Sequence, residues 1–323
     1  MSETVLYNNR IPLVIITGPT AVGKTDLSVK FAKKVGGEII SADSMQVYKK
    51  MDIGTAKIMP QEMNGIKHHM IDIFMPDHSF NVSEFKNISK KITEEIYNRG
   101  NIPIIAGGTA FYIQALLNDI SFDPEEEDGY KEELQRISEM PDGPDKLYKK
   151  LQEIDPESAE IIHKNNVKRV IRALDFYHKT SMKISEHNET QKSKKSPYNF
   201  LYFVLTMDRE RLYDRINQRV DIMIENGLIE EVKMLLDMGY DKSLTSMQGI
   251  GYKEIIDYLN GNCTKDECIY NIKINTRHFA KRQLTWYRRE KDVIWINKDE
   301  FENEEMMLKY ILEIYDKNIG NKK

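Results

Sequence analysis

The sequence predicts an α/β fold in which a parallel β-sheet is flanked by helices and interrupted by an all-helical insertion. Three observations support this fold class. Short apolar runs alternate with amphipathic stretches of helical period, as in parallel sheets whose faces are covered by helices. A glycine-rich loop joins the first apolar run to the first amphipathic stretch. A long central stretch is polar, helical in pattern and poor in strand signals.

The apolar runs give the expected strands in chain order. They are Leu13–Thr17, Glu38–Ala42, Ile102–Ala106, Phe200–Thr206 and Val293–Ile296. Amphipathic stretches at Thr25–Val35 and Val82–Asn98 predict helices that connect the first strands. We expect the run Phe200–Thr206, although far downstream, to join the same sheet.

The central stretch predicts a separate helical insertion domain over residues 119–196, which ends in a Lys/Ser-rich linker. The core domain is then built from residues 1–118 and 197–323. The 323 residues and 40% hydrophobic content are sufficient for this organisation.

Composition restricts the functional classes. The net charge of −4 argues weakly against nucleic-acid binding, although local basic patches matter more than the sum. The two cysteines match no zinc or redox motif. Because the N-terminus lacks a signal-peptide pattern and no apolar run reaches membrane-span length, we expect a cytoplasmic protein without a membrane partner.

A phosphate-binding loop follows the first strand and opens the first helix. Its glycines let the backbone N–H groups point inward, and the helix N-terminus favours an anion. Lys24 supplies a positive charge, and the Thr25 hydroxyl can bind Mg²⁺. A plain glycine-rich turn is the alternative. The loop consists of Gly18, Pro19, Thr20, Ala21, Val22, Gly23, Lys24 and Thr25.

Polar or glycine-rich residues follow three further strands, and ligands bind beyond the carboxyl ends of strands in open α/β sheets. Asp43 follows the second strand and could bind Mg²⁺, act as a base or cap a turn. Gly107-Gly108-Thr109 permits close approach of a ligand, to which Thr109 can hydrogen-bond, or forms an ordinary loop or N-cap. No Walker-B-type aspartate follows Ile102–Ala106, which counts against an ordinary ATPase.

Asp208 begins a helical pattern that is rich in arginine. Arg211, Arg215 and Arg219 are four residues apart and share a helix face. Near a phosphate loop such arginines can stabilise departing negative charge, whereas elsewhere they would form a solvated charged face.

The segment 276–289 is basic and interleaved with aromatic residues. Arg277, Lys281 and Arg288 fall near one helical face, which suits a phosphate backbone with rings available for stacking. A second basic cluster, Lys168-Arg169 with Arg172, lies in the insertion. A charged surface helix is the alternative for both clusters.

Six motifs, which span most of the chain, resemble those of the tRNA dimethylallyltransferase family, also called tRNA isopentenyltransferases or IPP transferases. Several are long and are not shared with kinases. They are GPTAVGKT (18–25), DSMQVY (43–48), MDIGTAK (51–57), GGTAFY (107–112), QGIGYKE (248–254) and KRQLTWYR (281–288).

The resemblance implies a P-loop core similar to nucleotide kinases, with an insertion that helps grip the anticodon stem-loop of tRNA. It implies transfer of a dimethylallyl group from dimethylallyl diphosphate to N6 of the adenosine at position 37, next to the anticodon, with release of diphosphate. It also implies a Mg²⁺ cofactor, held by Thr25 with Asp43 as a further candidate. We expect a monomer.

The resemblance also implies roles for individual residues. Asp43 resembles the general base and Thr109 a contact in the reaction channel. Lys24, Thr25, Arg209 and Arg215 resemble diphosphate ligands. The implied tRNA contacts are Asp43, Ser44, Met45, Gln46, Thr109, Val167, Lys168, Arg169, Val170, Ile171, Lys281, Arg282, Gln283, Trp286 and Arg288.

Two assignments stay open. On an ideal helix Arg209 does not share a face with Arg215, so either Arg209 precedes the helix or its role differs, and Arg219 could complete the diphosphate clamp. His68 lies in a matching region beside His69, and a structural role is favoured for it.

Three rival functions remain. A small-molecule kinase would share the P-loop but leaves the basic aromatic helix unexplained. A prenyltransferase acting on free AMP or ADP would need neither the insertion nor that helix. A non-catalytic RNA-binding module that uses the P-loop as a nucleotide switch leaves DSMQVY without a purpose.

Overall fold

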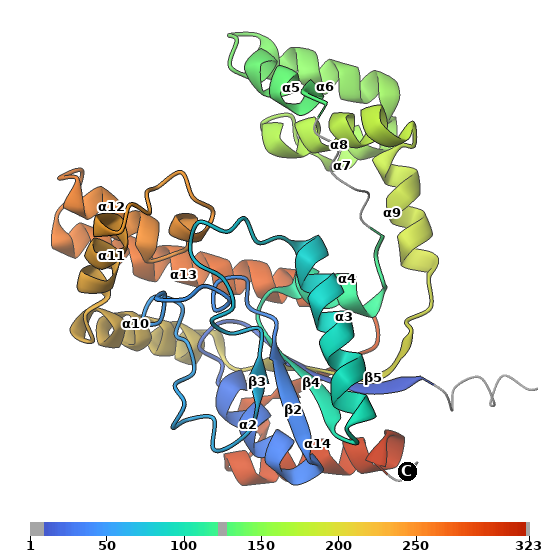
Figure 1. Ribbon diagram of the computed structural model, residues 1–323, viewed down its shortest axis with the longest axis vertical. Helices are drawn as coiled ribbons and strands as arrows, with labels where there is room; N and C mark the ends of the chain where they lie inside the picture. Colours follow the sequence, from blue (N-terminus) through green and yellow to red (C-terminus); the bar gives the residue numbers. More distant parts are fainter. Residues whose placement is uncertain (1–9, 122–127, 321–323) are drawn as a thin grey trace, which may run out of the picture. The chain divides into compact units, whose positions relative to one another are not determined.

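The computed structural model describes residues 10–121 and 128–320, which separate into two compact units (Figure 1). One unit contains the described residues up to Leu117 together with those from Pro197 onward. The other covers Asn118–Ser196, one residue more than the insertion expected over 119–196.

The first unit contains a six-stranded sheet in which every described pairing is parallel, so the predicted fold class is confirmed. The strand order is β3-β2-β4-β1-β5-β6. All five expected strands are present, with ends shifted by two residues or fewer. The sequence did not predict β3, because two polar residues give no strand signal. The bounds are β1 Ile11–Thr17, β2 Gly37–Ser41, β3 His68–His69, β4 Ile102–Gly107, β5 Tyr198–Thr206 and β6 Val293–Asn297.

The strand register brings the loops after these strands together. Thr17, the last residue of β1, pairs with Gly107 of β4 and Val204 of β5. Ser41, the last residue of β2, pairs with Ala106. Four loops that are distant in sequence therefore leave the sheet at one edge, as the strand-end argument requires.

Helices cover both faces of the sheet, which explains why its central strands are apolar throughout. Leu13 and Ile15 point into one hydrophobic cluster with residues of α3, α4 and α13. Val14 and Ile16 point into the other, with residues of α2 and α14. The helices of this unit are α2 Lys24–Val35, α3 Val82–Asn98, α4 Ala110–Leu117, α10 Arg209–Glu225, α11 Leu228–Asp237, α12 Tyr252–Leu259, α13 Lys265–Tyr287 and α14 Glu304–Asn318, with short 3₁₀ helices η2 Ser246–Gln248 and η3 Lys298–Glu300.

Local sequence sets the helix starts that matter for the site. Gly23, in the left-handed region, precedes α2. Asp208 caps α10 by accepting hydrogen bonds from the backbone N–H groups of Glu210 and Arg211. Thr264 and Glu267 form a capping box at the start of α13, the 23-residue basic helix.

The second unit is all-helical in its described part and has its own small hydrophobic core, which includes Leu147, Leu151 and Leu174. The buried carboxylate of Asp155 accepts hydrogen bonds from Ser158 and Ser185 and so joins two helices of the unit. Its helices are α5 Tyr130–Ser138, α6 Gly143–Ile154, α7 Pro156–Ile161, α8 Val167–Thr180 and α9 Ile184–Ser193. Across the described ranges, no helix combines the length and apolar character needed to span a bilayer.

Candidate functional site

The phosphate loop turns tightly between β1 and α2. Gly18 has φ +149° and Gly23 has φ +93°, conformations that glycine adopts readily. A Cβ at Gly18 would lie 2.6 Å from the carbonyl oxygen of Leu205, so the close approach of β5 also requires glycine. Ala21 adopts the left-handed conformation at φ +64°. The loop thus has the curled backbone expected of an anion cradle.

Side chains from distant segments hold this loop in place. Arg215 Nε donates a hydrogen bond to the carbonyl oxygen of Ala21 at 2.8 Å. Lys298 Nζ donates to the carbonyl oxygen of Val22 at 3.1 Å. On another side of the loop, the backbone N–H of Thr20 donates to Gln283 Oε1 at 2.9 Å.

The side chain of Lys24 turns back onto its own loop, where Nζ donates a hydrogen bond to the carbonyl oxygen of Pro19 at 3.3 Å. Burial, together with the positive charge of Arg219, lowers the pKa of Lys24 to about 8, although the negative charge of Asp43 opposes this shift. An anion bound here would stabilise the charged form of Lys24, since it would supply the missing counter-charge.

Asp43 lies beyond β2. Its Oδ1 accepts hydrogen bonds from the backbone N–H groups of Met45, at 2.9 Å, and Gln46, at 3.4 Å. The turn-capping role is therefore present. Among the described residues no hydrogen bond engages Oδ2, so the same carboxylate can also accept a proton or bind a cation.

Thr109 connects the loops after β2 and β4. Its Oγ1 accepts a hydrogen bond from the backbone N–H of Ser44 at 3.1 Å, and its own N–H donates to the carbonyl oxygen of Ala42 at 3.0 Å. A Cβ at Gly107 would lie 2.3 Å from that carbonyl oxygen, so glycine permits this approach. The structure therefore places Asp43 and Thr109 at neighbouring strand ends, beside the phosphate loop.

The buried face of α13 binds two of these loops. Gln283, only 5% exposed, accepts from Thr20 and donates through Nε2 to the carbonyl oxygen of Gly108 at 2.8 Å. The Tyr287 hydroxyl shares a 2.7 Å hydrogen bond with Thr17 Oγ1. The family resemblance implies a tRNA contact for Gln283, and the structure shows its side chain bonded to the phosphate loop and to the loop after β4. No motif gives Tyr287 a role, and only the spacing of buried positions along α13 indicates the contacts of either residue.

The arginines of α10 divide between two environments. The helix begins at Arg209, so this residue does not precede it, and its guanidinium lies 5.1 Å from the centre of the Tyr213 ring. Arg219 instead lies close enough to Lys24 to lower the pKa of that lysine. Burial and Arg215 lower the pKa of Arg219, and the carboxylates of Asp26 and Asp43 oppose this. Arg215 and Arg219 therefore both lie near the loop, and Arg211 pairs with Asp299, while the contact of Arg209 with diphosphate stays a prediction.

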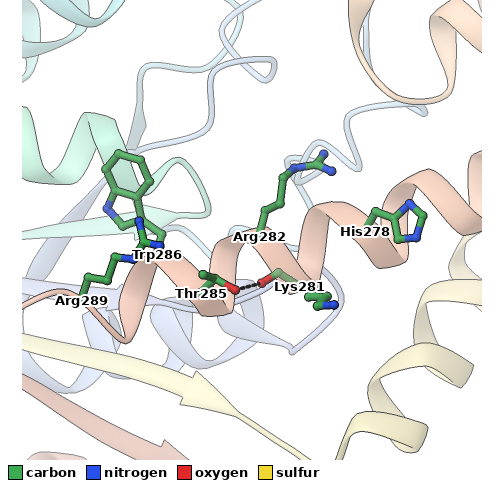
Figure 2. A pocket seen from close by; sticks show the side chains of 6 residues that line it. All are labelled: His278, Lys281, Arg282, Thr285, Trp286 and Arg289. Atoms are coloured by element: carbon green, nitrogen blue, oxygen red, sulfur yellow. Dashed lines mark hydrogen bonds between the residues drawn. The ribbon is translucent and has the colours of Figure 1, made fainter. Parts of the chain in front are cut away.

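The exposed face of α13 carries a pocket of about 440 Å³ (Figure 2). Lys281 and Arg282 are exposed, as is Arg288 at the C-cap of the helix, about two turns further on. Trp286 is half-buried, and its indole N–H donates to Glu290 at 2.7 Å. The pocket is lined by His278, Lys281, Arg282, Thr285, Trp286 and Arg289.

The segment 43–46 is supported by the loop that carries MDIGTAK. Gln46 Nε2 donates to the carbonyl oxygens of Thr55 and Ala56, each at 3.3 Å. Buried Glu231 accepts hydrogen bonds from the backbone N–H groups of Asp52 and Ile53, each at 2.8 Å. It also accepts from the Tyr252 hydroxyl at 2.6 Å, which joins this loop to QGIGYKE. No sequence signal points to Glu231, because an isolated glutamate in a helix is ordinary.

The remaining predicted residues lie elsewhere. In α8, Lys168 and Arg169 are exposed and Val167 is half-buried, whereas Val170 and Ile171 belong to the core of the second unit. His68 lies in β3 with its Nδ1 2.9 Å from the carbonyl oxygen of Ile66, and burial lowers its pKa. These are the features of a structural histidine.

The donor groups fit a magnesium ion only in combination with a bound phosphate compound. Within the described ranges, no group of three or more histidine, cysteine or acidic side chains could hold a metal by itself. The exposed Thr25 hydroxyl and the Asp43 carboxylate are the available oxygens. Mg²⁺ commonly keeps several waters and binds through few protein ligands together with substrate phosphates, so this sparse set is compatible with it.

Comparisons with known proteins agree with this geometry. The sequence model of the IPP transferase family matches residues 46–290. The chain is 53% identical over 304 residues to a tRNA dimethylallyltransferase of Lachnoclostridium phytofermentans, covering 94% of this chain and 97% of that protein. It is 50% identical over 297 residues to one from Acetivibrio thermocellus, covering 92% and 95%.

Two solved structures are also similar. The tRNA isopentenylpyrophosphate transferase of Bacillus halodurans has a TM-score of 0.73 and 42% identity, covering 97% of this chain and 98% of its own. A eukaryotic dimethylallyltransferase acting on tRNA has a TM-score of 0.76 and 31% identity, covering 96% of this chain and 77% of its own.

Proposed function

The chain belongs to the IPP transferase family of tRNA prenyltransferases, and from that premise we propose its specific reaction. It transfers a dimethylallyl group from dimethylallyl diphosphate to N6 of the adenosine at position 37, adjacent to the anticodon of tRNA, and releases diphosphate. One observation carries this proposal: an anion cradle and the uncommitted oxygen of Asp43 lie at one edge of the sheet.

Stabilisation of the leaving group is the main task of the site. The exocyclic amine of adenine is a weak nucleophile, because its lone pair is delocalised into the ring. The electrophilic carbon must therefore develop positive charge as its bond to the diphosphate oxygen breaks. The diphosphate leaves with the electron pair, and inward N–H groups of the loop stabilise it together with Lys24, Arg215 and Arg219.

Proton transfer completes the reaction. As the bond between N6 and the allylic carbon forms, the amine nitrogen becomes acidic and loses a proton. Asp43 Oδ2 accepts that proton, while Oδ1 stays in the turn that orients the carboxylate. Thr109, bonded to the backbone of Ser44, holds the two loops between which the base and the donor meet.

Magnesium neutralises part of the diphosphate charge when it is bound. We assign the Thr25 hydroxyl as its protein ligand rather than Asp43, because the proposed base needs Oδ2. The adenosine must leave its stack to reach the site, which favours a loop substrate. We assign recognition of the anticodon stem-loop to the exposed cations of α13 and to Lys168 and Arg169 of α8.

Incubation of the full chain with labelled dimethylallyl diphosphate, Mg²⁺ and unmodified tRNA tests the proposal. We expect one labelled product, N6-dimethylallyladenosine, when the tRNA is digested to nucleosides, and one diphosphate for each group transferred. Label found at another nucleoside would contradict the adenosine assignment. Transfer to free AMP or ADP at a comparable rate, or consumption of ATP, would favour one of the two rival enzymes.

A further inference from the structure

A lysine outside every recognised motif lies against the phosphate loop. Lys298 begins η3 directly after β6, whose parallel pairing with β5 brings its carboxyl end to the same edge of the sheet as the site. Asp299 fixes this position, because it accepts a hydrogen bond from the backbone N–H of Asp208 at 2.5 Å and pairs with Arg211. The half-buried Lys298 is therefore held in place by its neighbour in the chain.

The ammonium group of Lys298 lies over the last glycine of the loop. A Cβ at Gly23 would be 2.8 Å from Lys298 Nζ and 3.7 Å from a terminal nitrogen of Arg215. The two cations donate hydrogen bonds to consecutive carbonyl oxygens, Arg215 to Ala21 and Lys298 to Val22. They therefore hold the same short stretch of backbone.

The geometry of the peptide bond gives this contact a consequence. In a trans peptide the N–H of one residue points away from the carbonyl of the residue before it. When Lys298 holds the Val22 carbonyl on its side of the loop, the N–H of Gly23 points to the opposite side. Among the described residues no hydrogen bond engages this N–H. Gly23 is the N-cap residue of α2, so this N–H lies at the end of the helix where the dipole favours an anion.

We infer that Lys298 is a positioning residue for the diphosphate: it directs the Gly23 N–H toward the leaving group and adds positive charge behind the loop. This inference rests on the proposed function. Burial and the positive charges of Arg215 and Arg211 lower the pKa of Lys298, while Glu304 and Asp26 oppose the shift. A bound anion would offset the repulsion between these cations. The positive charge of Lys298 therefore stabilises the diphosphate complex more than it stabilises the free protein.

The full-length protein and three variants test the inference. Lys298→Met removes the ammonium group and keeps much of the side-chain bulk, whereas Lys298→Arg keeps a donor and a charge. Lys30→Met is the matched control, because it removes a lysine of α2 that pairs with Glu304 at 2.7 Å. Isothermal titration with inorganic diphosphate in the presence of Mg²⁺ gives affinity, and initial rates give KM for the donor and for tRNA. Thermal melting shows that each variant is folded.

We expect Lys298→Met to bind diphosphate about tenfold more weakly, with a similar rise in the donor KM and an unchanged KM for tRNA. Lys298→Arg should recover most of this loss, and Lys30→Met should stay within about twofold of wild type, as exposed ion pairs usually do. If Lys298→Met does not fold, Lys298→Gln replaces it with the same expectation.

The outcomes separate this inference from the proposed function. A wild-type protein that does not bind diphosphate would contradict the proposed donor site and the role of Lys298 together. A wild-type protein that binds diphosphate, with a folded Lys298→Met or Lys298→Gln variant that binds it equally well, would contradict the role of Lys298 alone. Equal losses of diphosphate affinity in Lys298→Met and Lys30→Met would show that only the overall positive charge matters. That result would also overturn the inference.

Discussion

The phosphate loop and the exposed face of α13 are both cationic, but their positive groups are held differently. At the loop, Lys24, Arg215 and Lys298 each donate to a backbone carbonyl, so their positions are fixed. Lys281 of α13 and Arg288 at its C-cap are exposed, and in the described ranges neither side chain makes an ion pair or hydrogen bond.

This difference matches two kinds of recognition. Stabilising a leaving group requires donors that are already in place when charge develops, because reorganisation would raise the barrier. Binding an RNA backbone requires positive charge over a wide surface, and flexible side chains can adapt to it. Helix α13 takes part in both, since Gln283 and Tyr287 face the loops while Lys281 faces outward.

The largest expected effect follows from substitution of Asp43, which lies beside the phosphate loop, the region whose charged groups are held in place. Asp43→Ala should lower kcat by about 10²–10⁴-fold, because the proton acceptor is lost, with tRNA affinity within a few-fold of wild type. Single-turnover rates and filter binding measure the two quantities. Asp43→Asn is the control, since its side-chain oxygen can keep the turn to Met45 but cannot take the proton. An active Asp43→Asn enzyme would show that the turn, rather than the base, is what catalysis requires.

Gln283→Leu tests whether the buried face of α13 is needed to hold the phosphate loop in the conformation that binds the donor. The change removes both hydrogen bonds to the loops while keeping a side chain of similar size. We expect kcat/KM for the donor to fall about tenfold or more, since two buried polar groups lose their partner. The salt dependence of tRNA binding should not change. A Gln283→Leu enzyme with weaker tRNA binding and a normal donor KM would place Gln283 among the RNA contacts instead.

Deprotonation of Lys24 should have a smaller effect, a fall in donor affinity that depends on pH. The pKa of Lys24 is about 8 in the free protein, below its ordinary value of 10.5, and a bound diphosphate should raise it. Donor affinity should therefore be insensitive to this group below pH 8 and fall by up to about tenfold per pH unit above it.

Calorimetry in two buffers of different ionisation enthalpy measures the accompanying proton uptake. Uptake should be small at pH 7 and clear at pH 9. The Lys24→Arg variant keeps its charge at both pH values, so it should lose most of the uptake. A Lys24→Arg variant that takes up as many protons as wild type would assign the titration to another group.

The features that depend on local sequence could be predicted. The spacing of Gly18, Gly23 and Lys24 identifies the phosphate loop, and apolar runs locate the strands of its sheet. The proximity of Asp43 and Thr109 follows from the rule that the carboxyl ends of parallel strands meet at one edge of the sheet. The strand register confirms this arrangement.

The partners of these residues could not be predicted, because they depend on tertiary packing. Nothing near Lys298 in the sequence connects it to Val22, 276 residues away. The inward orientation of Gln283 depends on which face of α13 meets the sheet, and the family resemblance implied only a contact with tRNA for this residue. Arg219 approaches Lys24 only because α10 packs beside the loop.

Lys281→Ala changes the exposed cationic face of α13 and should have the smallest effect, a modest loss of tRNA affinity. The side chain is exposed and, by the proposal, contacts phosphate of the tRNA. Its loss should weaken tRNA binding a few-fold, leave kcat unchanged and lower the slope of log K against log salt by about 0.7–0.9, the value for one phosphate contact. Lys309→Ala, an exposed lysine on α14, is the control and should leave the slope unaltered. Because the slope counts neutralised phosphates and cannot register a folding defect of the donor site, it separates the two regions even when affinities change little. An unchanged slope in Lys281→Ala would assign the RNA surface to cations other than those on this face of α13.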